Sequence, residues 1–447
     1  MIAGANARSN LVIAMTTAAA RHADSPQTHL DVACTVCNCV CDDLRVEVAA
    51  AGARPIEGAC RLAEPWFAAL AAAPAQPQAL IEGNSASFTQ AVDRAADILR
   101  ECQAPLICGL TRSSTDGLRA ALELAERVGG CIDPTTSPSQ TASTLALQSV
   151  GESTCTLGEV RHRADLVIFW GADPVTTHPR HFERYSVDAK GKFIPNGRDD
   201  RTVIVIGSAP SATSKLADEF IQIPPGGDFE VIWALRQLLR GIELPPSADV
   251  GVPRERLQQL VERMAGAQYG AVFYGTGLTQ SAAPHANVEA LSRLVAELNA
   301  KTRFTVRGLG LAGQAGATAA LCWLTGFPLA INLSRGYPRY GPGEYTANEL
   351  LARSEVDSCV VVGSERVGQL SPAAQRTLRC VPTIVLDYPH VSPAWDATVR
   401  FTTAVYGVHA AGTAYRMDDV SIPLRQLTPS SYATDDEVLR AILAKLA

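Results

Sequence analysis

Four cysteines near the amino terminus have the spacing of iron–sulfur ligands. They are Cys34, Cys37, Cys41 and Cys60, arranged as C-x2-C-x3-C with a fourth Cys after eighteen intervening residues. A tight turn can bring three thiolates to one side of the chain, and a later segment can supply the fourth, as a cubane four-iron four-sulfur cluster requires. We therefore predict that these four thiols are the ligands of such a cluster.

Two other interpretations of the cysteines stay open. C-x2-C also begins zinc sites, but those usually close with a second Cys or His pair, which this sequence lacks. Reduced cysteines can also pack as small hydrophobic side chains with no metal role. A fifth thiol, Cys39, lies inside the turn and fits no ligand pattern.

Composition limits the class of protein. With 447 residues, 47% of them hydrophobic and 19% charged, the chain can bury a large core and should divide into two or three α/β units. A net charge of −6 provides no basic surface for nucleic acid or an anionic membrane. The seven other cysteines stand singly, mostly in apolar segments, which is typical of a reducing cytoplasm: Cys102, Cys108, Cys131, Cys155, Cys322, Cys359 and Cys380.

The amino-terminal segment has no structural pattern. Residues 1–28 are rich in Ala, Ser, Arg and Thr, and their apolar run, Leu11 to Met15, is too short for a secretory signal or a membrane span. We expect a disordered tail, with Met15 as an alternative to Met1 for the start of translation. No run of about 18 apolar residues occurs elsewhere, so we expect a cytoplasmic protein without a membrane-spanning helix.

Buried strands and amphipathic helices alternate along most of the chain. Before them, Leu44–Val48 and Arg54–Ile56 predict an antiparallel pair beside the cysteine turn, and Ala63–Ala73 predicts a helix. Continuous apolar strands that alternate with amphipathic helices indicate parallel sheets covered on both faces. The strands expected are Pro105–Gly109, Leu166–Trp170, Val203–Gly207, Phe220–Ile223, Ala271–Tyr274, Cys359–Gly363, Thr383–Leu386 and Val399–Thr402. The helices expected are Gln90–Glu101, Thr115–Val128, Asp228–Leu239, Arg254–Ala265, Asn287–Ala300, Thr346–Arg353 and Asp436–Leu446.

Polar, glycine-containing loops follow several of these strands. Ligands of parallel sheets bind beyond the carboxyl ends of the strands, where small residues let the backbone approach and an arginine can pair with phosphate. A single Gly after a strand is more often a turn residue, so each loop alone is a weak signal. The candidate ligand contacts are Gly171, Asp173, Arg180, Arg184, Gly275, Gly277 and Gly363. His178 and His181 lack a nearby carboxylate or Cys at metal spacing, so we interpret them as hydrogen-bonding residues.

A set of motifs resembles the B-type subunit of formylmethanofuran dehydrogenase from about residue 30 to the carboxyl terminus. The motifs are Cys41-Asp42-Asp43, Gly58-Ala59-Cys60-Arg61, Gly171-Ala172-Asp173-Pro174, His178-Pro179-Arg180, Gly277-Leu278-Thr279, Trp323-Leu324-Thr325-Gly326-Phe327-Pro328, Ser334-Arg335-Gly336-Tyr337-Pro338 and Gly412-Thr413-Ala414-Tyr415-Arg416-Met417-Asp418. The last of these is the most specific to that type of chain.

The resemblance implies a molybdopterin-oxidoreductase-like α/β fold. Parallel-sheet domains would carry a small Cys-rich cap over residues 29–78, with no carboxyl-terminal barrel domain. One discontinuous α/β domain would comprise 79–150 and 302–447, and a second would comprise 151–301. In catalytic relatives the four cysteines hold a four-iron four-sulfur cluster, and a molybdenum or tungsten ion on two pterin dinucleotides interconverts carbon dioxide and formate.

One loop departs from this family pattern. Where catalytic relatives carry a metal-ligating Cys or selenocysteine followed by His, the segment Ile132–Thr141 places Ser139 and Gln140. A serine oxygen is a poorer ligand for a soft metal, and Gln cannot relay a proton at neutral pH. We therefore predict a degenerate site with no catalytic residue and no molybdenum or tungsten bis-pterin. Serine does ligate the metal in some relatives of the superfamily, so an active enzyme with Ser139 as ligand remains the alternative.

A second branch of the family fits this substitution. Methylotrophic bacteria contain a formyltransferase/hydrolase complex, in which a formyl group passes from formyl-tetrahydromethanopterin to a methanofuran-type carrier and is then hydrolysed by an amidohydrolase-like subunit. The sequence has no H-x-H, H-E-x-x-H or G-x-S-x-G motif of its own. The resemblance thus predicts a structural B-type subunit that assembles with A, C and D type subunits and the carrier, in one-carbon metabolism that converts formaldehyde to formate.

Overall fold

The computed structural model describes residues 26–49, 52–245 and 247–447. The predicted tail, with Met1, Met15 and the run Leu11–Met15, therefore lies outside the described residues up to position 25. The prediction placed residues 27 and 28 in the tail, but they belong to strand β1 (Gln27–Val32). Within the described part, no helix is both long and apolar enough to cross a membrane.

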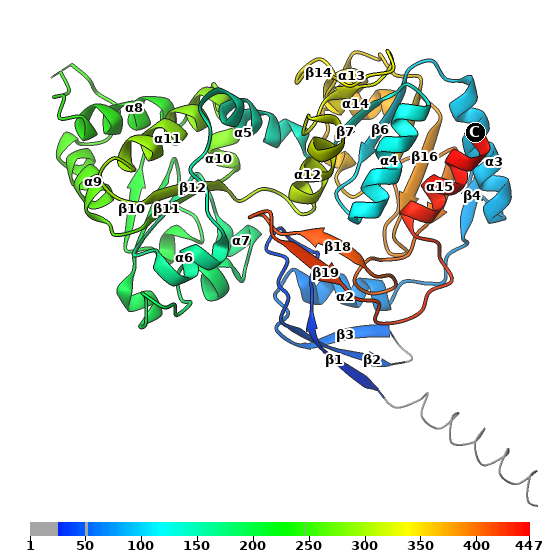
Figure 1. The fold of residues 1–447 in the computed structure, drawn as a ribbon, viewed down its shortest axis with the longest axis horizontal. Coiled ribbons are helices and arrows are strands. Elements are labelled where there is room, and N and C mark those ends of the chain that lie inside the picture. The colour runs from blue at the N-terminus through cyan, green and yellow to red at the C-terminus, as the bar shows by residue number, and fades with distance from the viewer. Residues whose placement is uncertain (1–25, 50–51, 246) are drawn as a thin grey trace, which may run out of the picture.

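A small cap carries the cysteine turn. Strands β1, β2 (Leu44–Ala49) and β3 (Gly52–Glu57) form an antiparallel sheet in the order β1-β2-β3, followed by helix α2 (Ala63–Ala71). We call residues 27–72 the cap. The predicted strand pair and helix are confirmed, and β1 is an addition to them. The cap projects below the two larger lobes of the molecule (Figure 1).

The first α/β domain is built on a nine-stranded sheet. Its order is β14-β13-β7-β6-β15-β16-β17-β4-β5, in which the run from β7 to β17 is parallel and the remaining edge strands are antiparallel. The strands are β4 (Ala79–Ile81), β5 (Asn84–Ala86), β6 (Pro105–Gly109), β7 (Cys131–Pro134), β13 (Ile331–Asn332), β14 (Arg339–Tyr340), β15 (Ser358–Val362), β16 (Thr383–Asp387) and β17 (Val399–Thr402).

Helices cover both faces of this sheet, which explains the continuous apolar runs of its strands. In β15, Val360 and Val362 pack with α3, α4, α12 and α15, whereas Cys359 and Val361 point to the opposite face with α13 and α14. The helices are α3 (Phe88–Glu101), α4 (Thr115–Arg127), α12 (Gln314–Thr325), α13 (Ala347–Ala352), α14 (Pro372–Leu378) and α15 (Asp435–Leu446).

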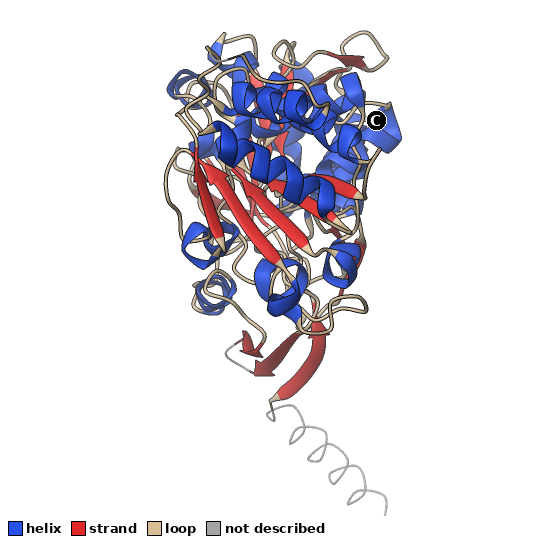
Figure 2. Cartoon of the chain, turned by 90° about the vertical axis from the view of Figure 1, so that its left-hand side faces the viewer, coloured by secondary structure: helices blue, strands red, loops and turns tan. Residues whose placement is uncertain are grey.

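The second α/β domain has a five-stranded, fully parallel sheet in the order β10-β9-β8-β11-β12. Figure 2 shows this sheet with helices across its near face. The strands are β8 (Leu166–Trp170), β9 (Thr202–Gly207), β10 (Glu219–Gln222), β11 (Gly270–Tyr274) and β12 (Phe304–Gly308). The covering elements are α5 (Ser137–Val150), α6 (Leu157–Arg163), the π-helix η1 (Phe182–Ser186), α8 (Asp228–Leu239), α9 (Arg254–Gly266) and α11 (Pro284–Leu298).

Both predicted boundaries of the second domain need correction. Helix α5 follows β7 of the first sheet, yet it packs against α11, and its Ala142 and Ala146 join the core of the second domain. Strand β12 pairs with β11, so the second domain continues past the predicted limit at 301. The missed helix α5 is rich in Ser, Thr and Gln, which hides the apolar stripe that a sequence pattern needs.

A hairpin of β18 (Gly412–Tyr415) and β19 (Ser421–Leu424) lies between the cap and the two domains (Figure 1). Ile422 and Leu424 pack with Ala33 and Val40 of the cap, which seats the cysteine turn against the carboxyl-terminal segment. Two short helices, α7 (Pro174–Thr177) and α10 (Thr276–Thr279), follow β8 and β11.

Asp133 at the end of β7 connects three segments in the interior. Its carboxylate accepts hydrogen bonds from the Ser137 hydroxyl at 2.6 Å and from the backbone N–H groups of Ala330 and Ala347 at 2.8 Å each. The Asp133 side chain has no exposed surface. It therefore fixes the start of α5 relative to β13 and α13.

We expect Asp133→Ala to lower the free energy of unfolding by about 3 kcal/mol or more, because three buried donors lose their acceptor. Urea denaturation of the full chain measures this change. The control is Asp199→Ala at an exposed position, which should stay within about 0.5 kcal/mol of wild type. A loss for Asp133→Ala no larger than that of the control would contradict the role of Asp133.

Candidate cofactor cleft and cysteine turn

A cleft of about 990 Å³ opens beyond the carboxyl ends of the second sheet. Loops that follow β8, β9, β11 and β12 line it, together with residues of helices α5 and α12. Cys37 and Asn38 of the cap also line it, so the cap and both domains contribute. This is the position at which parallel sheets bind ligands.

Four of the predicted ligand contacts line this cleft: Gly171, Asp173, Gly275 and Gly277. Glycine is required at Gly171 and Gly275 because the two loops approach each other too closely for a Cβ. A Cβ on Gly171 would approach the N of Leu278 to 2.9 Å, and one on Gly275 would approach the O of Gly171 to 2.6 Å. Asp173 accepts hydrogen bonds from the backbone N–H and the hydroxyl of Thr213, which orders the loop after β9. The structure thus brings these residues together at the cleft wall.

Three predicted contacts do not line the cleft: Arg180, Arg184 and Gly363. The guanidinium of Arg180 binds Asp43, Glu183 and the carbonyl of Gly58, and only 10% of its side chain is exposed, so it is not placed to pair with a phosphate there. Gly363 lies in a separate small pocket against the side chain of Arg112, with φ of +84°. Arg184 pairs with Asp42 and Asp43 of the cap. All three assignments are corrected because these residues contact other parts of the protein and do not line the cleft.

The cysteine turn is compact. The N–H of Cys34 donates to the O of Cys41 at 2.7 Å, and Val40 closes the turn with φ of +38°. Burial raises the pKa of the Cys34 thiol, and the nearby thiols of Cys37, Cys41 and Cys60 raise it further, as expected when sulfur atoms face one another. Cys39 is fully buried in the same group of side chains.

The four predicted cluster ligands lie near one another at the turn. Among the residues the structure describes, no three Cys, His, Asp or Glu side chains are placed as ligands of one metal ion. Cys37, Cys41 and Cys60 lie near enough to Cys34 to raise its pKa, and four thiols are the donor set of a four-iron four-sulfur cluster, whose positive metals would favour the thiolate form that burial alone opposes. Cys34, Cys37, Cys41 and Cys60 are the residues that would hold it, and the cluster would supply one-electron chemistry.

The predicted degenerate metal position lies on α5 at the cleft, in the first turn of a helix rather than in a loop. The hydroxyl of half-buried Ser139 donates to the carbonyl O of Thr136 at 2.9 Å. The side chain of Gln140, 3% exposed, accepts from the Thr136 hydroxyl at 3.1 Å and donates to the Thr318 hydroxyl on α12 at 2.5 Å. These side chains lack a thiolate donor and are engaged within the protein, so they are a poor fit to a pterin-bound metal.

Two histidines near the cleft are uncharged at neutral pH. Burial lowers the pKa of His178 to about 4, and its Nδ1 lies 2.9 Å from the Thr177 hydroxyl. Burial also lowers the pKa of His181 to about 3, and its Nδ1 lies 2.8 Å from the Ser186 hydroxyl. Both contacts agree with the prediction that these residues make hydrogen bonds.

Among the polar residues of the cleft that sequence patterns miss are Glu152 and Arg307. Arg307 on β12 is 9% exposed, donates to the O of Met417 and pairs with Asp419 at 3.3 Å. Burial raises the pKa of Glu152 to about 7; Arg307 opposes this rise and Asp419 adds to it. Neither Glu152 nor Arg307 belongs to a motif, so only the folded chain reveals them.

Comparison with solved structures identifies the fold. The formyltransferase/hydrolase complex FhcABCD from Methylorubrum extorquens, solved with methylofuran, contains a chain that matches with a TM-score of 0.68 and 24% identity, over 82% of this chain and 98% of that one. Acetylene hydratase from Pelobacter acetylenicus matches with a TM-score of 0.66 and 10% identity, over 94% of this chain and 69% of that one. The fold is therefore of the molybdopterin-oxidoreductase type, and the described residues include no barrel.

Comparison with curated proteins identifies the family, although no family model matches. The B-type subunit of the tungsten-containing formylmethanofuran dehydrogenase 2 of Methanocaldococcus jannaschii is 37% identical over 426 residues, which cover 93% of this chain and 98% of that protein. The B-type subunit of the Fhc formyltransferase/hydrolase complex of Methylorubrum extorquens is 25% identical over 287 residues, 64% of this chain and 74% of that protein. The chain belongs to the family of B-type subunits of formylmethanofuran dehydrogenase, which confirms the resemblance.

We expect Glu152 to make stability depend on pH. Its folded pKa of about 7 lies above the value of 4.5 for a free Glu, so the folded chain keeps a proton that the unfolded chain releases. The free energy of unfolding should therefore fall, relative to that of Glu152→Gln, as pH rises from about 4.5 to 7. Urea denaturation across this range measures the difference. Glu126→Gln, at an exposed position, should follow wild type, and parallel curves for wild type and Glu152→Gln would contradict the assignment.

Proposed function

We propose that this chain is the B-type subunit of a formyltransferase/hydrolase complex in tetrahydromethanopterin-linked one-carbon metabolism. Its role there is structural: it supplies a scaffold for A, C and D type subunits and does not itself transfer electrons. Formyl transfer to a methanofuran-type carrier and hydrolysis to formate belong to the partner subunits. Of the redox and hydrolytic branches of the family, we thus assign the chain to the hydrolytic one.

The observation that carries the proposal is the state of Ser139 and Gln140. A working metal site needs a donor directed at the metal, and a thiolate is the donor that suits molybdenum or tungsten. Here the Ser139 hydroxyl donates to its own helix, and Gln140 bridges α5 to α12. Ser139 thus bonds within its own helix, and Gln140 links two helices that line the cleft.

The second candidate is an active molybdenum or tungsten enzyme with Ser139 as ligand. Its support is the 37% identity to a tungsten-containing relative over nearly the whole of that protein, together with the open cleft of about 990 Å³. Identity over a chain measures shared fold and core, whereas the reaction depends on a few side chains. We therefore give the substituted metal position more weight than the overall identity.

For the four-thiol group we propose a retained four-iron four-sulfur cluster with no role in turnover. The ligand set Cys34, Cys37, Cys41 and Cys60 is complete, and its turn packs into the junction of the cap with both domains. A cluster in that place would stabilise the junction. The proposed hydrolytic reaction uses no electron acceptor, so the cluster would have no electrons to transfer.

We expect the purified complex to release formate from the formyl donor without any electron acceptor. Reduction of a dye with formylated carrier as substrate should remain at background, because the metal position lacks its donor. The two assays on one preparation measure hydrolysis and electron transfer side by side. Dye reduction that matches the rate of formate release would contradict the hydrolytic assignment and favour the second candidate.

We also expect Cys37→Ser and Cys60→Ser complexes to lose iron yet keep formate release within about twofold of wild type. Gel filtration and the formate assay measure assembly and turnover, and iron analysis confirms that the cluster is gone. Cys322→Ser is the matched control, because Cys322 is exposed and lies outside the turn. Loss of activity in assembled, iron-free complexes would show that the cluster takes part in turnover.

A further inference from the structure

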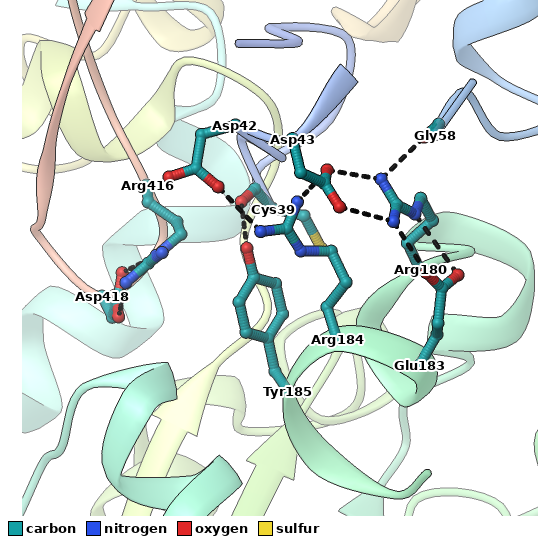
Figure 3. Close-up of polar contacts among 10 residues, drawn as sticks. All are labelled: Cys39, Asp42, Asp43, Gly58, Arg180, Glu183, Arg184, Tyr185, Arg416 and Asp418. Atoms are coloured by element: carbon teal, nitrogen blue, oxygen red, sulfur yellow. Dashed lines mark hydrogen bonds and ion pairs between the residues drawn. The ribbon is translucent and has the colours of Figure 1, made fainter. Parts of the chain in front are cut away.

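One arginine of the second domain holds both segments that carry the last two cysteines. From Arg180, which lies between α7 and η1, Nη1 donates to Oδ1 of Asp43 at 2.6 Å and to the O of Gly58 at 2.6 Å, while Nη2 donates to Oδ2 of Asp43 at 2.8 Å. Asp43 stands two residues after Cys41, and Gly58 stands two residues before Cys60. Figure 3 shows this guanidinium between the two segments.

The two segments touch at Gly58. With φ of +79°, this residue adopts a conformation that favours glycine. A Cβ there would lie 3.1 Å from the O of Asp43 and 3.5 Å from Nη1 of Arg180. Gly58 therefore lets the two segments approach each other, and its carbonyl is also one of the groups that Arg180 binds.

Neighbouring arginines strengthen the contact between this part of the second domain and the cap. Arg184 of η1, also predicted as a ligand contact, instead pairs with Asp42 at 2.7 Å and with Asp43 (Figure 3). From the cap, Nη2 of Arg61 donates to the O of Val175 and the O of Thr176 at 2.7 Å each. Neither arginine contacts both cysteine segments, so Arg180 is distinct in this group.

We propose that Arg180 is a positioning residue that sets the separation of Cys41 and Cys60 by binding Asp43 and Gly58 at once. This inference rests on the proposed cluster. The planar guanidinium is suited to the task, because its forked donors span a carboxylate and a carbonyl together. A lysine ammonium keeps the charge but is a point donor that cannot reproduce the fork.

The test compares Arg180→Lys with wild type in the full chain purified within its complex. In iron-free protein, alkylation of the Cys41 and Cys60 thiols, followed by peptide mass spectrometry, should be about tenfold or more faster in Arg180→Lys, as expected when charge-assisted hydrogen bonds to the segment are lost. In iron-loaded protein, loss of iron to a chelator should be about 10–100-fold faster, the usual effect of removing a partner of the ligand shell.

The matched control is Glu183→Gln, which changes a partner of the same guanidinium but leaves Asp43 and Gly58 in place. It should alkylate and release iron at the wild-type rate. If Arg180→Lys fails to fold, Asp43→Asn takes its place, with the same faster alkylation expected. Wild-type rates in Arg180→Lys, or equal acceleration in Glu183→Gln, would overturn the proposal. A wild-type chain that takes up no iron would contradict the cluster, whereas the alkylation rates of iron-free protein would still decide the role of Arg180.

Discussion

The hydrogen bond from the Ser139 hydroxyl to the carbonyl of Thr136 is the constraint on which this account depends. Ser139 donates its hydroxyl proton in this bond. At this position catalytic relatives are expected to present a thiolate or selenolate. Gln140, next in the chain, links α5 to α12 through Thr318. Because α5 packs on the second domain while α12 packs on the first, the Gln140–Thr318 bond connects the two domains at the cleft. In the proposed structural role, this position contributes to the architecture of the cleft.

Contacts with both domains would retain the cysteine turn even if the proposed cluster has no redox use. It is held from the first domain by Arg112, which donates to the O of Thr35, and from the second by Arg180 and Arg184, which bind Asp43 and Asp42. Removing such a turn would expose buried surface on every side of the junction. Selection for a folded subunit is therefore enough to retain the turn, whether or not the proposed cluster carries electrons.

Much of the fold was predictable from sequence where a local pattern reports burial. Predictions failed where no such pattern exists or where the contacts join distant parts of the chain. Leu166–Trp170 is an uninterrupted apolar run because both faces of its sheet are covered, and its bounds were predicted as they occur. The Ser-rich helix α5 has no such signal. Cys spacing located the turn because ligands act locally, but Arg180 was misassigned because its partner Asp43 lies 137 residues away. Glu152 and Arg307 stand in no motif, and only folding brings them into the cleft.

The most direct test is elemental analysis of the purified complex by inductively coupled plasma mass spectrometry. The account predicts iron in amounts that match the B-type chain, with tungsten and molybdenum far below stoichiometry even after growth with both metals supplied. Stoichiometric tungsten or molybdenum that remains through purification, and is lost in Ser139→Ala, would contradict the account.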